Sequence, residues 1–442
     1  MSDNVNRLFG LAQGAKNALL REMHGLKRQR REPETHEHDQ PLTRGPVDRF
    51  ADHPGYRQIA LQKEYADRLG LVSPYFRVHE GRAADTTRIG GREYLNFSTY
   101  DYLGLGGHPQ IAAAAKAAID LFGTSTGASR VVSGERPLHG ELEHALADLY
   151  GTESCITLVS GHATNVTVIG HLLGPKDLVV YDTLCHNSIL QGALLSGATR
   201  RAFRHNDAAA LEQILQKAQG LYQRTLIVIE GLYSMDGDLP PWDDIIRLKR
   251  QYNTLLMVDE AHALGVLGER GYGSHELSQL EPGTVDIWMG TLSKTLASCG
   301  GYIAGSKALV EYLKFTAPGF LYSVGLSPPL AAAALTALRI LEQEPNRVQD
   351  LAERSRSFLA QAQAVGLKTG RSAGYAIIPI MIGNSVKAAQ YSNALFERGV
   401  NVQPIVYPAV EEKSARLRFF LSSKHTHEQI EHTVRELATV CT

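Results

Sequence analysis

Short apolar runs alternate with longer helical stretches through the middle of the chain. The runs are rich in Val, Ile and Leu, and we predict strands at 154–159, 178–181, 225–230, 255–259, 285–289 and 302–304. Continuous apolar runs are typical of parallel strands that are buried on both faces. The alternation therefore predicts an α/β fold, with a mainly parallel sheet that helices cover on both sides.

Four segments are expected along the chain. They are a basic N-terminal arm and linker (1–46), a lead-in segment (47–100), a large domain (101–325) and a smaller C-terminal α/β domain (326–442). In residues 1–31, apolar residues near helical spacing precede a group of Lys and Arg. This stretch predicts a solvated arm, a docking helix for an acidic partner, or a mitochondrial transit peptide, although Ser is scarce.

The composition is that of a globular protein and narrows the function classes. Hydrophobic residues make up 43% of the 442, and the formal net charge of -1 argues against a nucleic-acid partner. No apolar run is long enough for a transmembrane segment, and no signal peptide opens the chain. The four cysteines have no CxxC spacing, so we expect reduced thiols and a cytoplasmic protein. His36 and His38 lack a second ligand cluster, so no metal site is expected.

Lys294 has the most informative surroundings of any residue in the chain. It follows the apolar run at 285–289, lies among small residues, and precedes several glycines. Small neighbours allow a flat ligand to approach an amine, and partial burial lowers the pKa of that amine. A lysine that forms a Schiff base with pyridoxal 5'-phosphate (PLP) needs both conditions.

Other strand ends carry groups that suit the same cofactor. Asp259 ends the strand at 255–259, where a carboxylate could pair with a protonated pyridine nitrogen, and His262 could reach the ring hydroxyl. Small residues at 160–161 open a helix whose backbone N–H groups suit a phosphate, and His162 could stack on the ring. The stretch 230–238 is again a strand followed by a polar turn.

These stretches resemble the α-oxoamine synthase family of fold-type I PLP enzymes, which includes serine palmitoyltransferase and 8-amino-7-oxononanoate synthase. The motifs occur in family order: NFSTYDYLGLGGHP (96–109), GTSTGASRVVSGERPLHGELE (123–143), SGHATN (160–165), DTLCHNS (182–188), EGLYSMDGD (230–238), VDEAHALGVLGERGYG (258–273), GTLSK (290–294) and ARLRFFLSSKHT (415–426). The first ~50 residues lie outside the resemblance.

The resemblance implies an aspartate aminotransferase-like fold and an acyltransferase reaction. In that reaction an amino acid and an acyl thioester, on CoA or an acyl carrier protein, condense with decarboxylation to an α-amino ketone, CO₂ and a free thiol. A PLP-dependent aminotransferase or aldolase remains an alternative. So does a carrier-docking partner subunit, although the presence of Lys294, Asp259 and His262 argues against it.

The resemblance also implies residue roles. Lys294 would bind PLP and act as the base, with Asp259 at the pyridine nitrogen, His262 at the ring oxygen and His162 stacked on the ring. The other implied cofactor contacts are Ser160, Gly161, Ser234, Thr291 and, across the interface of a homodimer with shared active sites, Ser323 beside Tyr322. The implied substrate contacts are Tyr100, His186 and Arg418, the last for the amino-acid carboxylate; Arg416 is expected at the surface.

The chain departs from the common family pattern in places. Tyr100 stands where several members carry Asn, and serine palmitoyltransferase resembles this chain at that place because it has a tyrosine there. The loop at 408–411 lacks a usual hydroxyl. The stretch 74–81 shows no obvious counterpart of the arginine that the biotin-pathway enzyme uses, which argues against a pimeloyl thioester. Together with the long arm, the stretches PYFRVHEG (74–81), SGHATNV (160–166) and HNSI (186–189) instead resemble family members of polyketide and fatty-acyl assembly lines, which take the acyl group from an acyl carrier protein.

Overall fold

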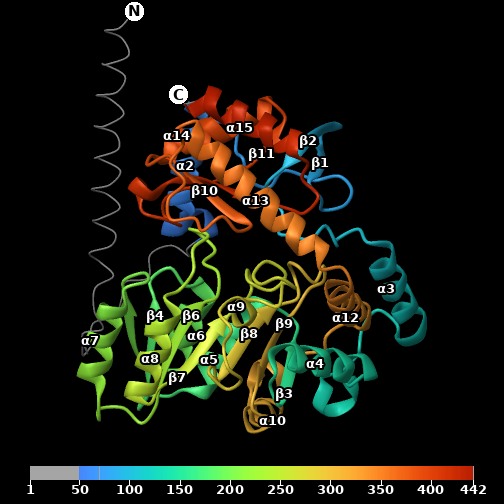
Figure 1. Ribbon diagram of the computed structural model, residues 1–442, viewed down its shortest axis with the longest axis vertical. Coiled ribbons are helices and arrows are strands. Elements are labelled where there is room, and N and C mark those ends of the chain that lie inside the picture. The colour runs from blue at the N-terminus through green and yellow to red at the C-terminus, as the bar shows by residue number, and fades with distance from the viewer. Residues whose placement is uncertain (1–48, 69, 442) are drawn as a thin grey trace, which may run out of the picture. The chain divides into compact units, whose positions relative to one another are not determined.

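Figure 1 shows a computed structural model of the chain, which describes residues 49–68 and 70–441. The chain forms two compact units, Met1–Arg68 and Leu69–Thr442. In the first unit the described elements are a 3-10 helix, Phe50–Asp52, and helix α2, Pro54–Arg68, neither of which contains a buried residue. The arm and linker predicted at 1–46 lie outside the described residues.

The second unit is built on a sheet that has seven strands in its described part, in the order β3-β9-β8-β7-β6-β4-β5. Their bounds are β3 Ser154–Leu158, β4 Leu178–Asp182, β5 Thr199–Phe203, β6 Thr225–Glu230, β7 Leu255–Asp259, β8 Ile287–Thr291 and β9 Gly301–Gly305. Neighbouring strands from β5 to β8 are parallel, whereas β9 is antiparallel to both β3 and β8. The prediction of a mainly parallel sheet is therefore confirmed.

Helices cover both faces of this sheet (Figure 1). Alternate residues of β6 enter different cores: Leu226 and Val228 pack with helices α5, α6 and α10, whereas Ile227 and Ile229 pack with α4, α7 and α8. Successive side chains of a strand point to opposite faces, so a strand between two helical layers must be apolar throughout. The helices are α3 Pro109–Phe122, α4 Pro137–Tyr150, α5 Gly161–Leu172, α6 Asn187–Leu195, α7 Ala208–Ala218, α8 Trp242–Tyr252, α9 Ser274–Leu277, α10 Lys307–Thr316, α11 Pro318–Leu321, α12 Pro328–Gln343, α13 Asn346–Ala364, α14 Ser385–Glu397 and α15 His427–Cys441.

Two smaller sheets complete the second unit. Their strands are β1 Thr86–Ile89, β2 Arg92–Asn96, β10 Ile377–Met381, β11 Val400–Asn401, β12 Gln403–Ile405 and β13 Arg416–Phe420. Strand β2 pairs with β1 and, in parallel, with β11, so the lead-in segment and the C-terminal portion share one sheet. The other sheet has the order β10-β13-β12 and packs with helices α13 and α14, and α15 packs on these two helices. The domain boundaries proposed at 100 and 325 remain predictions.

Two strands of the large sheet differ from the sequence-based expectation by more than one residue at an end. Strand β8 lies two residues later than the apolar run suggested, at Ile287–Thr291, so Thr291 is part of the strand. Strand β5, at Thr199–Phe203, was not predicted, because it is an edge strand whose Arg200 and Arg201 are exposed. Edge strands commonly carry charged residues and therefore lack the apolar signal of central strands. In the described part of the chain, no helix combines the length and the apolar character that crossing a bilayer requires.

Candidate active site

The parallel strands end together at one edge of the large sheet, and acids occupy three of those ends. Asp182, Glu230 and Asp259 are the last residues of β4, β6 and β7, and all three are buried. Glu230 and Asp259 lie directly opposite each other in the parallel register. Ligands of α/β sheets bind at such carboxyl ends, so this edge is the candidate active site.

Lys294 lies in a tight loop between β8 and β9. The loop is closed by hydrogen bonds from Leu292 N to Gly300 O (2.9 Å) and from Ala297 N to Lys294 O (2.9 Å). Burial lowers the pKa of Lys294 to about 8, while the charges of Asp259 and Glu230 oppose that shift. The amine therefore lies within the electrostatic influence of these two acids, and the part of its population that is neutral near neutral pH suits it to nucleophilic and basic roles.

Aromatic side chains surround the amine. The Nζ atom of Lys294 lies 5.5 Å from the ring centroid of Tyr100, which is 39% exposed. The ring of Tyr100 packs edge-on against the rings of His262 and Phe420, with ring centroids 5.9 Å and 4.8 Å apart. His262 Nδ1 is 2.7 Å from the hydroxyl of Tyr102. Burial, followed by the charges of Lys294 and Arg418, holds the pKa of His262 well below its usual value, so His262 is neutral.

Asp259 is held in place by two donors. Its Oδ2 accepts from Asn165 Nδ2 at 2.8 Å, and its Oδ1 accepts from Ala261 N at 3.0 Å. The same Nδ2 of Asn165 donates to Ser188 Oγ at 3.0 Å, which lies 2.7 Å from His186 Nδ1. A chain of hydrogen bonds therefore joins Asp259 to His186 through two residues to which the sequence had assigned no role.

Glu230 was also missed, although it opens the EGLYSMDGD motif. Its Oε1 accepts from His186 N at 2.6 Å, and its Oε2 accepts from Ser234 N at 3.0 Å. Burial, followed by the charge of Asp259, raises the pKa of Glu230 to about 8. One carboxyl group thus fixes the backbone of two predicted site residues. An acid at the end of a buried strand beside another such acid was the sequence signal that could have revealed it.

A narrow cradle lies at the start of helix α5. A Cβ atom placed on Gly161 would lie 2.7 Å from Thr291 Oγ1, so only glycine leaves this approach open. Ser160 caps the helix, accepting from Ala163 N at 3.4 Å. His162 is exposed, and its ring centroid lies 6.0 Å from that of His186. A helix N-terminus with free backbone N–H groups favours a phosphate, so this cradle fits the phosphate of PLP.

The two arginines of β13, Arg416 and Arg418, both contact the loop that follows β6. The expectation that Arg416 lies at the surface is wrong. Arg418 Nη1 donates to Ser234 O at 2.9 Å, and its buried Nε has no partner among the described residues. Arg416, expected at the surface, is only 5% exposed and forms an ion pair with Asp236. Residues two apart in a strand face the same side, so Arg416 follows Arg418 into the interior rather than to the surface.

Ser323 is not part of this cluster within one chain. It is half-buried, whereas the neighbouring Tyr322 is 87% exposed. Its hydroxyl donates to Val324 O at 3.4 Å, a bond to the next residue in the sequence. The predicted role of Ser323, at the site of a second copy, therefore stays a prediction.

A second cluster of ionisable groups lies around His205. Its Nδ1 is 3.0 Å from Asp182 and its Nε2 is 2.8 Å from Asp238. With Asp236, the residues His205 and Asp238 have a spacing that could hold a metal ion. Burial alone would lower the pKa of His205, but the hydrogen bonds with Asp182 and Asp238 outweigh it and raise the pKa to about 9. The protonated ring and Arg416 therefore neutralise these acids.

We expect His205→Gln to destabilise the protein in a pH-dependent manner. The folded-state pKa lies above the ordinary ~6.5 of histidine, so the stabilisation is complete below pH ~6.5 and is lost as the pH rises through about 9. At pH 6 the free energy of unfolding should fall by about 3 kcal/mol, as for a broken buried ion pair. Urea unfolding at pH 6 and pH 10 measures this, with exposed His144→Gln as the matched control. An equal loss at both pH values would contradict the assignment.

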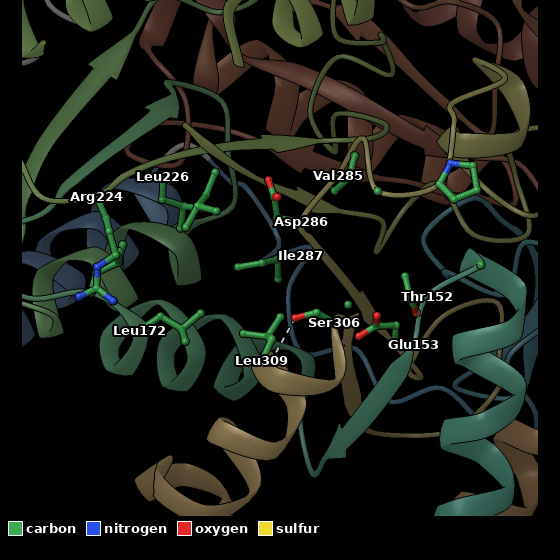
Figure 2. A pocket seen from close by; sticks show the side chains of 16 residues that line it. Thr152, Glu153, Leu172, Arg224, Leu226, Val285, Asp286, Ile287, Ser306 and Leu309 are labelled. Atoms are coloured by element: carbon green, nitrogen blue, oxygen red, sulfur yellow. Dashed lines mark hydrogen bonds between the residues drawn. The ribbon is translucent and has the colours of Figure 1, made fainter. Parts of the chain in front are cut away.

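A cavity of about 520 Å³ opens at the opposite edge of the large sheet, where β6, β7 and β8 begin (Figure 2). Leu226 and Ile287 line it from the strands, and Leu172 and Leu309 line it from helices α5 and α10. None of the predicted site residues is among its lining residues. The cavity is therefore separate from the candidate active site.

Comparison with known proteins decides the family. The family model for aminotransferase class I and II matches residues 92–437. The chain belongs to this family. The 8-amino-7-oxononanoate synthase 1 of Bacillus velezensis is 38% identical over 355 residues, covering 80% of this chain and 90% of the relative. That of Symbiobacterium thermophilum is 39% identical over 352 residues, covering 80% and 89%.

Solved structures agree with the sequence relatives. Serine palmitoyltransferase from Sphingomonas wittichii matches with a TM-score of 0.84 and 30% identity, over 88% of this chain and 97% of that one. A structure of SPT with its PLP internal aldimine matches with a TM-score of 0.83 and 28% identity, over 87% and 97%. The chain is thus an α-oxoamine synthase with a fold-type I PLP-dependent transferase fold. As such, it is an acyltransferase that condenses an amino acid with an acyl thioester, with loss of CO₂.

Proposed function

We propose that Lys294 and Asp259 flank the PLP ring in this α-oxoamine synthase. The observation that carries the proposal is that Asp259 ends β7 and Lys294 follows the end of the neighbouring strand β8, where Asp259 has the strongest electrostatic effect of any charged group on the amine. Bound PLP supplies an electron sink that stabilises negative charge on the α-carbon of the amino acid. Asp259 would keep a proton on the ring nitrogen, and His262 would offer its Nε2 to the ring oxygen.

The amine of Lys294 would also move the α-proton. Its pKa of about 8 leaves part of the population neutral near pH 7.5, when it can accept a proton. Gly161, Ser160 and Thr291 would hold the phosphate, His162 would cover the ring, and Ser234 would contribute a hydroxyl from the loop that Glu230 fixes. These residues position the amino acid so that the bond to be broken stands over the ring.

Arg418 would bind the carboxylate of the amino acid. Its buried Nε has no partner in the described part of the chain, and a buried unpaired donor calls for an acceptor such as a carboxylate oxygen. We expect Arg418→Leu to raise KM for the amino acid about 100-fold, from the loss of two charge-assisted hydrogen bonds, and to leave KM for the thioester nearly unchanged. Steady-state kinetics on both substrates measures this, with exposed Arg200→Leu as the control. A larger effect on the thioester would refute this role.

The acyl donor is carried on CoA or on an acyl carrier protein. The relatives named above are 8-amino-7-oxononanoate synthases, whereas the two solved structures named above are serine palmitoyltransferases. The only arginine of the stretch 74–81, Arg77, stacks on Phe396 at 3.5 Å and lies 3.4 Å from oxygens of Asn393 and Asn401. These contacts already occupy the guanidinium of Arg77, which favours an acyl donor other than pimeloyl thioester. The basic residues at 16–31 favour a donor that is bound to a carrier protein.

The active unit is proposed to be a homodimer whose sites are shared. Exposed apolar side chains support this proposal, because Val132, Phe315 and Tyr322 are 78%, 72% and 87% exposed in one chain. Such residues commonly mark an interface. Ser323 would then reach the phosphate in the second copy. All four cysteines are free, which supports a reducing compartment such as the cytoplasm.

The proposed reaction is tested by measuring CO₂ release from carboxyl-labelled amino acids with and without a panel of acyl thioesters. We expect release to require both substrates and to match the formation of α-amino ketone and free thiol. An aminotransferase or aldolase would turn over the amino acid without a thioester. Turnover that does not depend on the thioester would therefore refute the assignment, and no turnover at all would favour the non-catalytic docking subunit.

A further inference from the structure

His186 is held by a chain of side chains that begins at Asp259. Asn165 on α5 donates to Asp259 Oδ2 (2.8 Å) and to Ser188 Oγ (3.0 Å), and Ser188 Oγ lies 2.7 Å from His186 Nδ1. Asn165 and Ser188 are 1% and 0% exposed, so water does not compete for these bonds. His186 itself comes from the loop before α6, where Glu230 accepts from its backbone N–H.

The amide of Asn165 settles the direction of these hydrogen bonds. Its Nδ2 only donates, and both of its hydrogens are used, one on Asp259 and one on Ser188. Turning the amide over would place its carbonyl oxygen against the carboxylate of Asp259, which is repulsive. Ser188 Oγ therefore accepts from Asn165, and its single hydroxyl hydrogen is free to donate to His186 Nδ1.

A second donor confirms the same state of the ring. The backbone N–H of Ser188 donates to His186 Nδ1 at 3.3 Å. An Nδ1 atom that accepts from both the hydroxyl and the backbone of Ser188 carries no proton. A neutral imidazole has its proton on the other nitrogen, and Nε2 of His186 makes no hydrogen bond to any residue that the structure describes.

We infer that Asn165 and Ser188 are positioning residues that keep His186 neutral, with its proton on Nε2 and available to an oxygen of the substrate. The inference rests on the proposed function, since it deepens the role of one residue of that site. Asn165 acts on both ends of this series of hydrogen bonds, because the same amide that donates to Ser188 also orients the carboxylate of Asp259. The oxygen that Nε2 would meet belongs either to the amino-acid carboxylate or to the thioester carbonyl.

The surroundings of His186 favour the neutral ring. The charged and titratable groups that face it are Asp259, Lys294, His162, Arg418 and, through the backbone, Glu230. Burial lowers the pKa of His186, and Lys294, His162 and Arg418 lower it further, whereas Asp259 alone opposes them. Removing a donor from Nδ1 would weaken the neutral form and raise the pKa, by about one unit for one hydrogen bond.

The test is NMR of the full-length, PLP-loaded protein labelled with ¹⁵N-histidine, with His186→Gln used to assign the signal. Long-range ¹H–¹⁵N spectra report which ring nitrogen carries the proton. We expect the Nε2–H form in the wild type, with a pKa below ~6.5. Ser188→Ala should give a mixture of tautomers and raise the pKa by about one unit, and Ser188→Thr should restore the wild-type signal.

Asn165→Ala gives a second route to the same answer if Ser188→Ala fails to fold. Without the amide, Ser188 Oγ can accept from a protonated Nδ1, so the Nδ1–H form should become populated. The exposed His144 should be unchanged in every variant. A wild-type His186 with its proton on Nδ1, or a tautomer ratio that neither Ser188→Ala nor Asn165→Ala alters, would overturn the inference. The spectra do not require turnover, so this result is distinct from failure of the CO₂ assay.

Discussion

Lys294→Ala should abolish condensation, lowering turnover by at least about 10⁴-fold, because one amine supplies both the covalent attachment of PLP and the base. The variant should also lose the long-wavelength absorbance of lysine-bound PLP. Burial lowers the pKa of this amine to about 8, so the wild-type side chain is partly neutral and can act as a nucleophile and as a proton acceptor. An alanine side chain can do neither. Absorbance spectra and initial rates with saturating PLP measure both losses.

Lys307→Ala is the matched control for this loss. Lys307 is an exposed lysine at the start of α10, and its ion pair with Glu311 is at the surface. We expect the control to keep both the absorbance and the rate. Added methylamine should restore part of the turnover of Lys294→Ala, because it replaces the missing base. Full turnover in Lys294→Ala would show that another group performs the chemistry.

Asp259→Asn should lower turnover about 1,000-fold, at the centre of the range for loss of a group that holds a catalytic proton. An asparagine has the shape of the aspartate, but its single carbonyl oxygen can accept from only one of the two donors, Asn165 Nδ2 or Ala261 N. The substitution therefore removes the negative charge and one of the two hydrogen bonds, while the side-chain shape is kept. Without that charge the pyridine nitrogen loses its proton, and the ring withdraws electrons less strongly.

The change should be visible before any substrate is added. We expect the absorbance of bound PLP to shift in Asp259→Asn, and the rate of α-proton exchange of the amino acid to fall in parallel with turnover. Asp244→Asn, at an exposed position of α8, is the matched control and should behave as the wild type. If the rate of α-proton exchange were unchanged in Asp259→Asn, Asp259 would not be the group that holds the proton on the pyridine nitrogen.

The sequence was sufficient where function depends on strand ends. The runs that end at Glu230 and Asp259 are apolar on both faces, so their bounds were predicted correctly, and the acid at Asp259 stood out. Strand β5 could not be found in the same way, because its exposed arginines interrupt the apolar pattern. Family resemblance then supplied the roles of the residues inside recognised motifs.

The sequence was insufficient where function depends on which side chains meet. Asn165 and Ser188 lie in motifs that the sequence singled out, yet only the packing of α5 against α6 brings them together. Arg416 was placed at the surface because an arginine is rarely buried without a partner. Its partner, Asp236, lies far away in the sequence and was not visible from the local pattern.

The central claim is that the amine of Lys294 captures PLP. The most direct test is borohydride reduction of the PLP-loaded protein, followed by digestion and mass spectrometry of the peptides. The account predicts one pyridoxyl group per chain, on the peptide that contains Lys294, and none in Lys294→Ala. A pyridoxyl group on a different lysine of the wild-type protein, or no adduct at all, would contradict it.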